Sequence, residues 1–211
     1  GDPDIAGAET LYAPLLEVAP PPDCPAPPPL NAALVFSSKN GLHWFCALTD
    51  RRHWPVYCVG DATAASARAK GFKNVKSAGK DVQALAALII SSETGQTRPI
   101  YYAGPAEPSG DLIGDLQKQG FTAIAAVFYE TRPVSRLSQR IMKALKTEEP
   151  FTVLLYSAKG ANAFTQLIPR GGDISIISLS AAVDQAVKTK GLRARMIAKS
   201  PDETALIACL P

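Results

Sequence analysis

The feature that most constrains the fold of this chain is an internal repeat at a shift of about 120 residues. At that shift Ser37 aligns with Ser157 and Lys39 with Lys159. Identities are few, but the order of strand, Ser-x-Lys, strand, small-residue turn, helix and glycine repeats as well. Two similar α/β units in one chain leave a cleft between them, and such clefts bind ligands.

Short apolar runs alternate with helical patterns along both halves of the chain. We expect strands at 32–36, 56–59, 74–76, 99–103, 122–129, 152–156, 174–179 and 194–198. We expect helices at 41–48, 64–70, 82–90, 112–119, 137–144, 161–167, 181–189 and 202–210. Asp81 should cap its helix, and it aligns one residue out of step with Asp202. This alternation predicts an α/β fold with parallel sheets and right-handed crossovers.

Two features near the N-terminus bear on domain organisation. Residues 20–29 read PPPDCPAPPP, which predicts an extended connector, with a proline-rich recognition motif as the alternative. The sequence of residues 13–20 resembles that of residues 126–133, and Glu17 aligns with Glu130. A strand and a helix precede the second copy, whereas the first has too few residues for them. We therefore expect that this first strand–helix unit is mostly missing; a naturally short N-terminus is the alternative.

Composition excludes several classes of function. The 211 residues carry 22 Lys and Arg against 19 Asp and Glu, and these charges are scattered. A net charge of +3 argues against a nucleic-acid partner and is compatible with an anionic small molecule. No apolar run reaches the ~20 residues of a membrane span, and no signal peptide opens the chain. We expect neither a nucleic-acid nor a membrane partner.

Cysteine and histidine usage favours a cytoplasmic protein without a metal site. No two cysteines form a CxxC pair, and His43 and His53 lie ten residues apart without a third ligand nearby. Cys46 and Cys58 lie in apolar runs, so we expect buried free thiols and a reducing compartment.

Small hydroxyl residues stand where predicted strands give way to helices: Ser37, Ser38, Thr63, Ser157 and Ser180. Backbone N–H groups and the helix dipole make such turns suitable for carboxylates and phosphates. Each residue could instead be a plain N-cap. Their recurrence in equivalent places of two units favours an anion-binding cleft, and Lys39 and Lys159 add positive charge.

The chain contains no GxGxxG, Walker or GxSxG motif and no evident Cys-His or Ser-His-Asp grouping. Catalysis would then depend on binding geometry and a hydroxyl acid, without a cofactor or a nucleophile.

Five stretches together resemble the uroporphyrinogen-III synthase family. They are VFSSKNGL (35–42), PVYCVGDATAASARAKGF (55–72), VFYETRP (127–133), VLLYSAKGANAF (153–164) and SPDETALIACL (200–210). The resemblance implies two similar flavodoxin- or Rossmann-like lobes with parallel sheets, the first of them discontinuous. Residues 1–14 plus 134–211 would form one lobe and 24–126 the other. Residues 15–23 and 127–133 would supply two antiparallel linker strands.

The resemblance also implies a reaction. The family's substrate is hydroxymethylbilane, a linear tetrapyrrole with eight carboxylates. Ring closure removes water and inverts the last pyrrole through a spiro intermediate, in haem biosynthesis. The family uses no cofactor or metal, and we expect a monomer. Two alternatives are a non-catalytic two-lobed binding or sensor module and a structural partner domain in a haem-pathway assembly.

The resemblance assigns roles residue by residue. Tyr129 would assist departure of the hydroxyl group, and Thr63 would bind a substrate carboxylate. The family's serine turns match Ser37 and Ser157, and Ser180 would take the place of a threonine. The turns themselves add Ser38, Lys39 and Lys159 to the predicted substrate ligands. The chain departs from the family at 180–183 (SAAV), which lacks a threonine, and at 103–105 (AGP), which lacks an arginine after the glycine.

Overall fold

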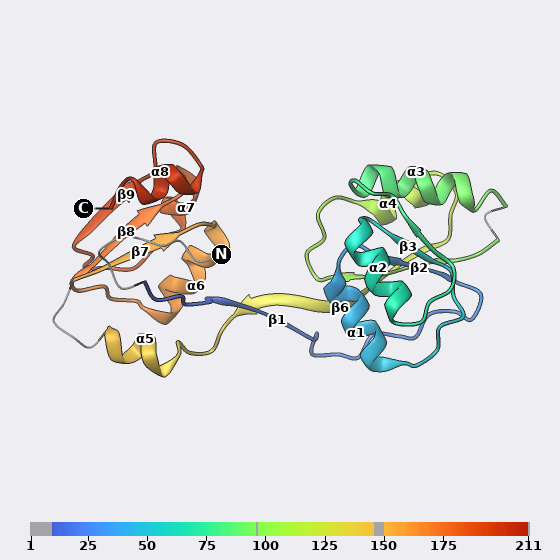
Figure 1. Cartoon of the computed structure of the whole chain (residues 1–211), viewed down its shortest axis with the longest axis horizontal. Coiled ribbons are helices and arrows are strands. Elements are labelled where there is room, and N and C mark those ends of the chain that lie inside the picture. The colour runs from blue at the N-terminus through green and yellow to red at the C-terminus, as the bar shows by residue number, and fades with distance from the viewer. Residues whose placement is uncertain (1–9, 96, 146–149, 211) are drawn as a thin grey trace. The chain divides into compact units, whose positions relative to one another are not determined.

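The computed structural model describes residues 10–95, 97–145 and 150–210. Contacts divide the chain into two compact units (Figure 1). Unit 1 consists of the described residues of Gly1–Glu17 and Arg132–Pro211, and unit 2 is Val18–Thr131. No helix among the described residues is long and apolar enough to cross a membrane.

The larger sheet contains six strands in the order β1-β6-β5-β2-β3-β4. Their bounds are β1 (Leu16–Ala19), β2 (Ala33–Phe36), β3 (Val56–Cys58), β4 (Val75–Ser77), β5 (Ile100–Pro105) and β6 (Ala123–Pro133). The pairs from β6 to β4 are all parallel. The chain passes from β2 to β3 and β4 on one side, then returns to add β5 and β6 on the other. The sheet therefore has a topological switch point between β2 and β5.

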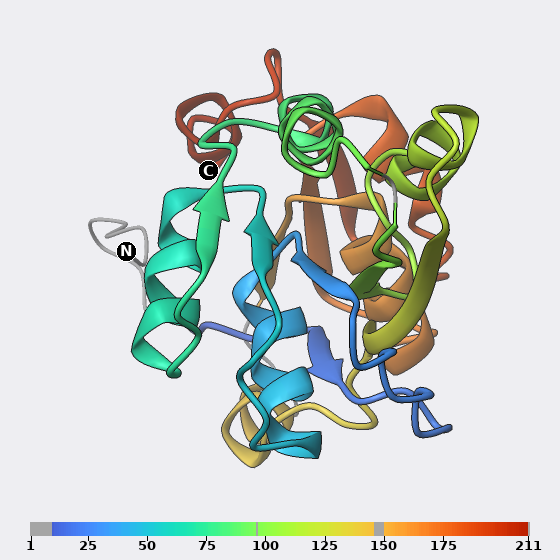
Figure 2. The same ribbon diagram turned by 90° about the vertical axis from the view of Figure 1, so that its right-hand side faces the viewer.

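Helices cover both faces of this sheet (Figure 2). Helices α1 (Lys39–Leu48) and α2 (Asp61–Ala69) pack on one face, and α3 (Val82–Ser92) and α4 (Leu112–Lys118) on the other. Alternating residues of β2 supply both cores: Leu34 packs with Phe45 of α1, whereas Val35 packs with Leu85 of α3. A strand buried on both faces explains the continuous apolar run in the sequence.

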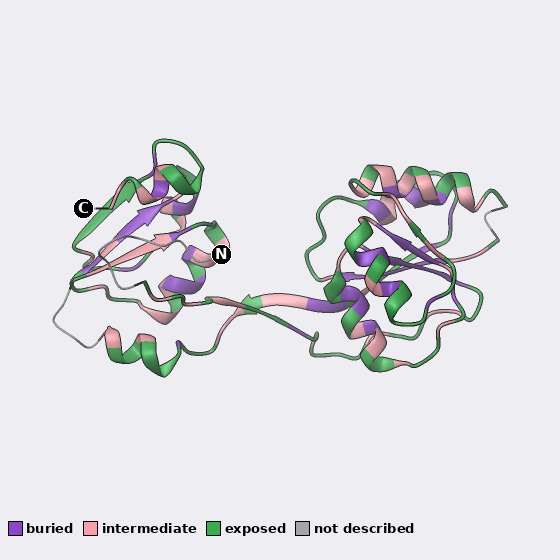
Figure 3. Cartoon of the chain, in the orientation of Figure 1, coloured by how far each residue is buried: buried purple, intermediate pink, exposed green. Residues whose placement is uncertain are grey.

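Unit 1 contains a three-stranded parallel sheet in the order β7-β8-β9. Its strands are β7 (Phe151–Leu155), β8 (Ile174–Ser178) and β9 (Ala194–Ile197), and its helices are α5 (Gln139–Ala144), α6 (Ala158–Leu167), α7 (Ala181–Ala186) and α8 (Glu203–Ile207). Ile176 packs with Phe164 on one face of β8, and Ile177 packs with Leu206 on the other. Figure 3 shows this buried core beneath exposed helix surfaces. The predicted α/β class with parallel sheets is confirmed.

The internal repeat is present in the structure, but its register at the first turn was wrong. Ser38 caps α1 by accepting from the Gly41 N–H, and Ser157 caps α6 by accepting from the Gly160 N–H. Equivalent caps thus lie 119 residues apart. Ser37 consequently matches Tyr156, not Ser157, and Lys39 does not match Lys159. The segment that joins this helix to the next strand is one residue longer in the second copy. From that strand onward, equivalent residues therefore lie 120 apart.

The later turns keep the predicted register. Gly60 and Ser180 are the N-cap residues of α2 and α7, 120 residues apart. Asp81 and Asp202 cap α3 and α8 by accepting from the backbone N–H groups of residues 84 and 205, at 2.8 Å in both cases. The predicted cap at Asp81 and its one-residue offset are confirmed.

Several predicted boundaries were wrong, each for a local reason. Helices predicted at 41–48 and 161–167 begin at Lys39 and Ala158, because the serine before each supplies the cap. The helix predicted at 181–189 ends at Ala186, and the Thr189 hydroxyl then donates to the Ile168 carbonyl. The strand predicted at 122–129 continues to Pro133 as β6, because β1 pairs with it.

Three further expectations concern single segments. Residues 20–29 contain no helix or strand, as predicted for a connector, and the Trp54 Nε1–H group donates to the Pro29 carbonyl at 2.9 Å. Cys58 is a buried free thiol, but Cys46 is only half-buried, because it sits on the flank of α1.

The strand–helix unit predicted to be missing before Glu17 falls on residues 1–9, which lie outside the described residues.

Candidate functional site in the strand–helix turns

The turn after β2 brings Tyr129 to the serine pair. The Ser38 Oγ atom lies 2.8 Å from the Tyr129 hydroxyl oxygen, and it also accepts from the Gly41 N–H at 3.4 Å. Only 8% of the surface of Tyr129 is exposed. The predicted catalytic residue therefore contacts a predicted substrate ligand at the N-terminus of α1.

A β-bulge directs Tyr129 towards this turn. The register between β5 and β6 pairs Gly104 with Val127 and then Pro105 with Tyr129. Phe128 is therefore skipped in the pairing of the two strands. Pro105 has no backbone N–H to donate, so the ladder is weakened where the register shifts. Bulges of this kind re-aim side chains and are frequent beside active sites.

The Ser37 hydroxyl has a partner that the sequence did not reveal. Its Oγ atom lies 2.8 Å from the hydroxyl oxygen of Tyr102 on β5. Burial raises the pKa of Tyr102, while the Ser37 hydrogen bond acts in the opposite direction. The phenol is therefore neutral at physiological pH. Only the adjacency of β2 and β5 brings the two residues together, and residue spacing does not show that adjacency.

Thr63 is not a helix cap. The N-cap of α2 is Gly60, which makes no side-chain capping bond, and Thr63 is the third residue of the helix. Most of Thr63 is buried, but within the described residues no fully buried side-chain oxygen lacks a hydrogen-bond partner, so the unpartnered Thr63 hydroxyl is the part of the residue that reaches solvent. The cap interpretation was therefore wrong for Thr63, and its hydroxyl is available to a ligand at a helix N-terminus.

Unit 1 has a similar pair of turns. Ser157 and Ser180 accept from helix N–H groups at 3.0 and 3.4 Å, so both are N-caps. They follow β7 and β8, which are adjacent and parallel, so the two turns lie at the same edge of the sheet. At the position equivalent to Ser37, the Tyr156 hydroxyl donates to Glu203 Oε1 at 3.1 Å.

The two predicted lysines occupy slightly different places. Lys39 is the exposed first residue of α1, whereas Lys159 is the half-buried second residue of α6. A lysine in the first turn adds positive charge to a helix end that is already positive, which favours an anionic ligand.

The predicted site residues thus form two groups. Ser37, Ser38, Lys39, Thr63 and Tyr129 belong to unit 2, and Ser157, Lys159 and Ser180 belong to unit 1.

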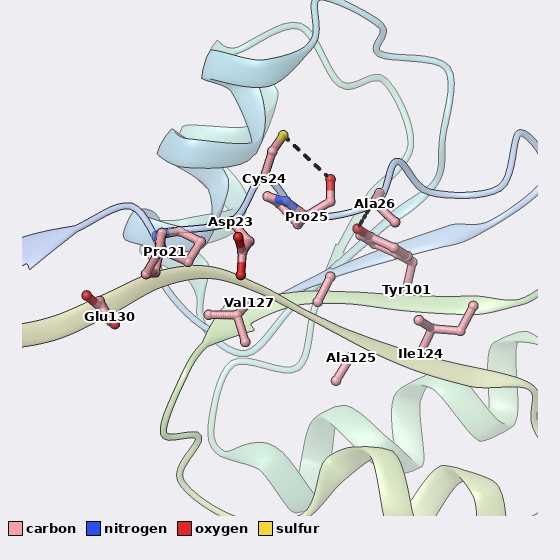
Figure 4. A pocket seen from close by; sticks show the side chains of 12 residues that line it. Pro21, Asp23, Cys24, Pro25, Ala26, Tyr101, Ile124, Ala125, Val127 and Glu130 are labelled. Atoms are coloured by element: carbon pink, nitrogen blue, oxygen red, sulfur yellow. Dashed lines mark hydrogen bonds between the residues drawn. The ribbon is translucent and has the colours of Figure 1, made fainter.

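A pocket of about 400 Å³ lies elsewhere in unit 2 (Figure 4). The proline-rich segment lines it with Pro21 and Cys24, opposite Val127 and Glu130 of β6. The Tyr101 hydroxyl donates to the Ala26 carbonyl beside it. None of the predicted site residues lines this pocket. Across the described ranges, no group of three or more His, Cys, Asp or Glu side chains could hold a metal ion.

Comparisons with known proteins bear on the fold and on the family of this chain. The chain is similar to the crystal structure of uroporphyrinogen-III synthetase from Helicobacter pylori, with 22% identity and a TM-score of 0.58 over 99% of this chain and 94% of that chain. A mutant uroporphyrinogen III synthase from Thermus thermophilus is more distant, with 11% identity and a TM-score of 0.44 over 92% of this chain and 84% of that chain. The Helicobacter likeness supports the fold alone.

The sequence comparison goes further than the fold. We find no similar sequence among curated proteins. The family model described as uroporphyrinogen-III synthase HemD, however, matches residues 4–208, which is nearly the whole chain. The chain therefore belongs to the uroporphyrinogen-III synthase family.

Proposed function

We propose that this chain cyclises hydroxymethylbilane to uroporphyrinogen III with Tyr129 as the hydrogen-bond donor to the departing hydroxyl group. The reaction is that of the family, a cyclising loss of water, and the family match does not favour a non-catalytic module. The observation that carries the role of Tyr129 is its 2.8 Å contact with Ser38 at the N-terminus of α1.

The chemistry needs a neutral donor at the leaving group. The bond between the hydroxymethyl carbon and its oxygen breaks, both electrons leave with the oxygen, and a proton must reach that oxygen for water to depart. A phenol can donate this hydrogen bond or proton. The Ser38 hydroxyl then donates to the phenol oxygen of Tyr129, while its lone pair still accepts from the Gly41 N–H. Ser38 in this way keeps Tyr129 oriented and stabilises charge on its oxygen.

The remaining site residues bind carboxylates. In unit 2 these are the Thr63 hydroxyl, the Ser37 hydroxyl and the Lys39 ammonium group. In unit 1 they are Ser157, Lys159 and Ser180 with the N–H groups of α6 and α7. Charged acceptors make hydrogen bonds stronger than neutral ones, so several such contacts fix the conformation of a substrate with many carboxylates. That conformation decides which pyrrole carbon attacks.

We further propose that the two units are the lobes expected for the family. Residues 24–126 form one lobe, 1–14 plus 134–211 form the other, and 15–23 and 127–133 connect them. The division of contacts and the ion pair of Arg132 with Glu17, at 2.9 Å, support this organisation. We propose a cytoplasmic location, because all four cysteines are free thiols, as is usual in a reducing compartment. The monomeric state is proposed from the resemblance to the family alone.

The proposal is tested by removing one hydroxyl. Tyr129→Phe should slow formation of the III isomer roughly tenfold or more, because acid assistance is typically worth ~10²–10⁴. Tyr57→Phe is the matched control, since Tyr57 is also buried in the same sheet but donates to Glu93 at 2.7 Å. Steady-state kinetics with separation of the I and III isomers gives both rates. Equal rates for the two variants would remove Tyr129 from the mechanism.

A further inference from the structure

The hydrogen bond between Tyr102 and Ser37 crosses the topological switch point of the unit 2 sheet. Ser37 directly follows β2, Tyr102 lies on β5, and these strands are neighbours at the point where the strand order reverses. Ligands of open parallel sheets bind at the carboxyl ends of strands at such points. The bond therefore lies where substrate is expected, one residue away from the contact of Ser38 with Tyr129.

Packing does not explain the hydroxyl of Tyr102. The ring belongs to an apolar cluster that includes Val35 and Leu112, and a phenylalanine would fill the same space. The ring lies over Gly104, where an added Cβ would come within 2.5 Å of it. The sequence thus leaves room for the Tyr102 ring, while the buried hydroxyl depends on Ser37 for its hydrogen bond.

The repeat shows that the fold itself does not require this pair. In unit 1 the position equivalent to Ser37 is Tyr156, whose hydroxyl donates to Glu203 on α8. Within the described residues of unit 1, the same turn therefore forms with a tyrosine in place of the serine at this position. The serine–tyrosine pair occurs in the copy of the turn that also holds Tyr129.

Either hydroxyl can be the donor of this bond. We assign the proton to Tyr102, because a phenol is more acidic than an alkyl hydroxyl. Ser38 differs in that its oxygen already accepts from the Gly41 N–H group, which leaves its proton for Tyr129. The proton of Ser37 is then available to another acceptor. A substrate carboxylate is an acceptor of the right kind, and the bond to Tyr102 fixes the direction in which Ser37 offers its proton.

We propose that Tyr102 is a positioning residue for the cyclisation: it orients Ser37 towards a substrate carboxylate and steadies the Ser37-Ser38 turn against Tyr129. This role rests on the proposed function above. It acts through Ser37 and requires no contact of Tyr102 with the substrate. Loss of the Tyr102 hydroxyl should therefore loosen the substrate conformation and weaken the selection of the III isomer over the I isomer.

The test compares two neighbouring tyrosines on opposite faces of β5. Tyr102→Phe should lower kcat/KM roughly three- to tenfold and decrease the ratio of III to I isomer. Tyr101→Phe is the matched control, because its buried hydroxyl also loses one hydrogen bond, to the Ala26 carbonyl, away from the serine turn. Both variants should show similar losses of thermal stability, but only Tyr102→Phe should change the isomer ratio.

A double-mutant cycle separates positioning from a structural role. If Tyr102 acts through Ser37, then Tyr102→Phe combined with Ser37→Ala should be no worse in kcat/KM than Ser37→Ala alone. Fully additive losses, or an unchanged isomer ratio in a folded Tyr102→Phe variant, would overturn the inference and leave the proposed function intact. Production of only the I isomer by the wild-type protein would overturn both.

Discussion

Two pairs of hydroxyl groups hold the turn after β2: Ser37 with Tyr102, and Ser38 with Tyr129. Each of the two consecutive serines is thereby joined to a tyrosine from a different strand. Tyr129 could be anticipated from the sequence because it lies in the stretch VFYETRP. Tyr102 could not, since its role depends on the neighbourhood of β2 and β5, which a single sequence does not reveal.

Thr63 provides a prediction at this scale. Its hydroxyl has no hydrogen-bond partner within the described residues, so Thr63→Val removes a ligand group while keeping the side-chain shape. We expect KM to rise roughly tenfold, because a hydrogen bond to a charged group is lost, with little change in melting temperature. Thr63→Ser retains the hydroxyl and should retain most affinity. Equal KM values for wild type and Thr63→Val would contradict the ligand role.

Side-chain caps determine where helices begin, and the sequence prediction placed two capped helices, α1 and α6, too late because it passed over the serine before each. Ser38, Asp81, Ser157, Ser180 and Asp202 each accept from a helix N–H, which fixes where five helices begin. The alignment at a shift of 120 residues was wrong at the turns after β2 and β7. It matched Lys39 with Lys159, which lie one residue out of structural register. Matching the caps, and then Phe45 with Phe164 in the two cores, corrects it.

The corrected repeat gives a prediction for two equivalent glycines. An added Cβ at Gly41 would lie 2.4 Å from the carbonyl oxygen of Ala103, whereas at Gly160 it would meet only the Ser157 hydroxyl at 3.2 Å. Gly41→Ala should therefore lower the free energy of unfolding by about 1–3 kcal/mol. Gly160→Ala should change it by less than ~1 kcal/mol, since alanine favours helix. Urea denaturation measures both, and equal effects would refute the close contact of α1 with β5.

At the scale of the whole molecule, buried titratable groups concentrate in unit 2. Burial raises the pKa of Tyr57, Cys58 and Tyr101 to about 12 in each case, with the hydrogen bond to Glu93 adding to the effect at Tyr57. The α/β class could be anticipated from alternating apolar and helical runs, and the two units from the internal repeat. The burial of the Cys58 thiol was predicted from its apolar run. The burial of the Tyr57 and Tyr101 hydroxyls depends on which strands are central, and that was not evident from the sequence.

These groups predict alkaline destabilisation of unit 2. In the unfolded chain Cys58 ionises near pH 9.0 and the tyrosines near pH 10.0, but the folded state holds their protons to about pH 12. Their contribution to stability is therefore complete below about pH 9 and is lost as pH rises towards 12. The urea midpoint should be lower at pH 10.5 than at pH 8, and less so in Tyr101→Phe. Identical midpoints would contradict the burial of these groups.

The central claim is that this chain directs ring closure with inversion of the last pyrrole. The most direct measurement supplies the purified protein with freshly prepared hydroxymethylbilane, oxidises the products and separates the I and III isomers by chromatography. Spontaneous closure yields the I isomer and provides the protein-free control. We predict mostly III isomer from the wild-type chain, in proportion to protein concentration. An isomer mixture identical to the protein-free control would contradict the account.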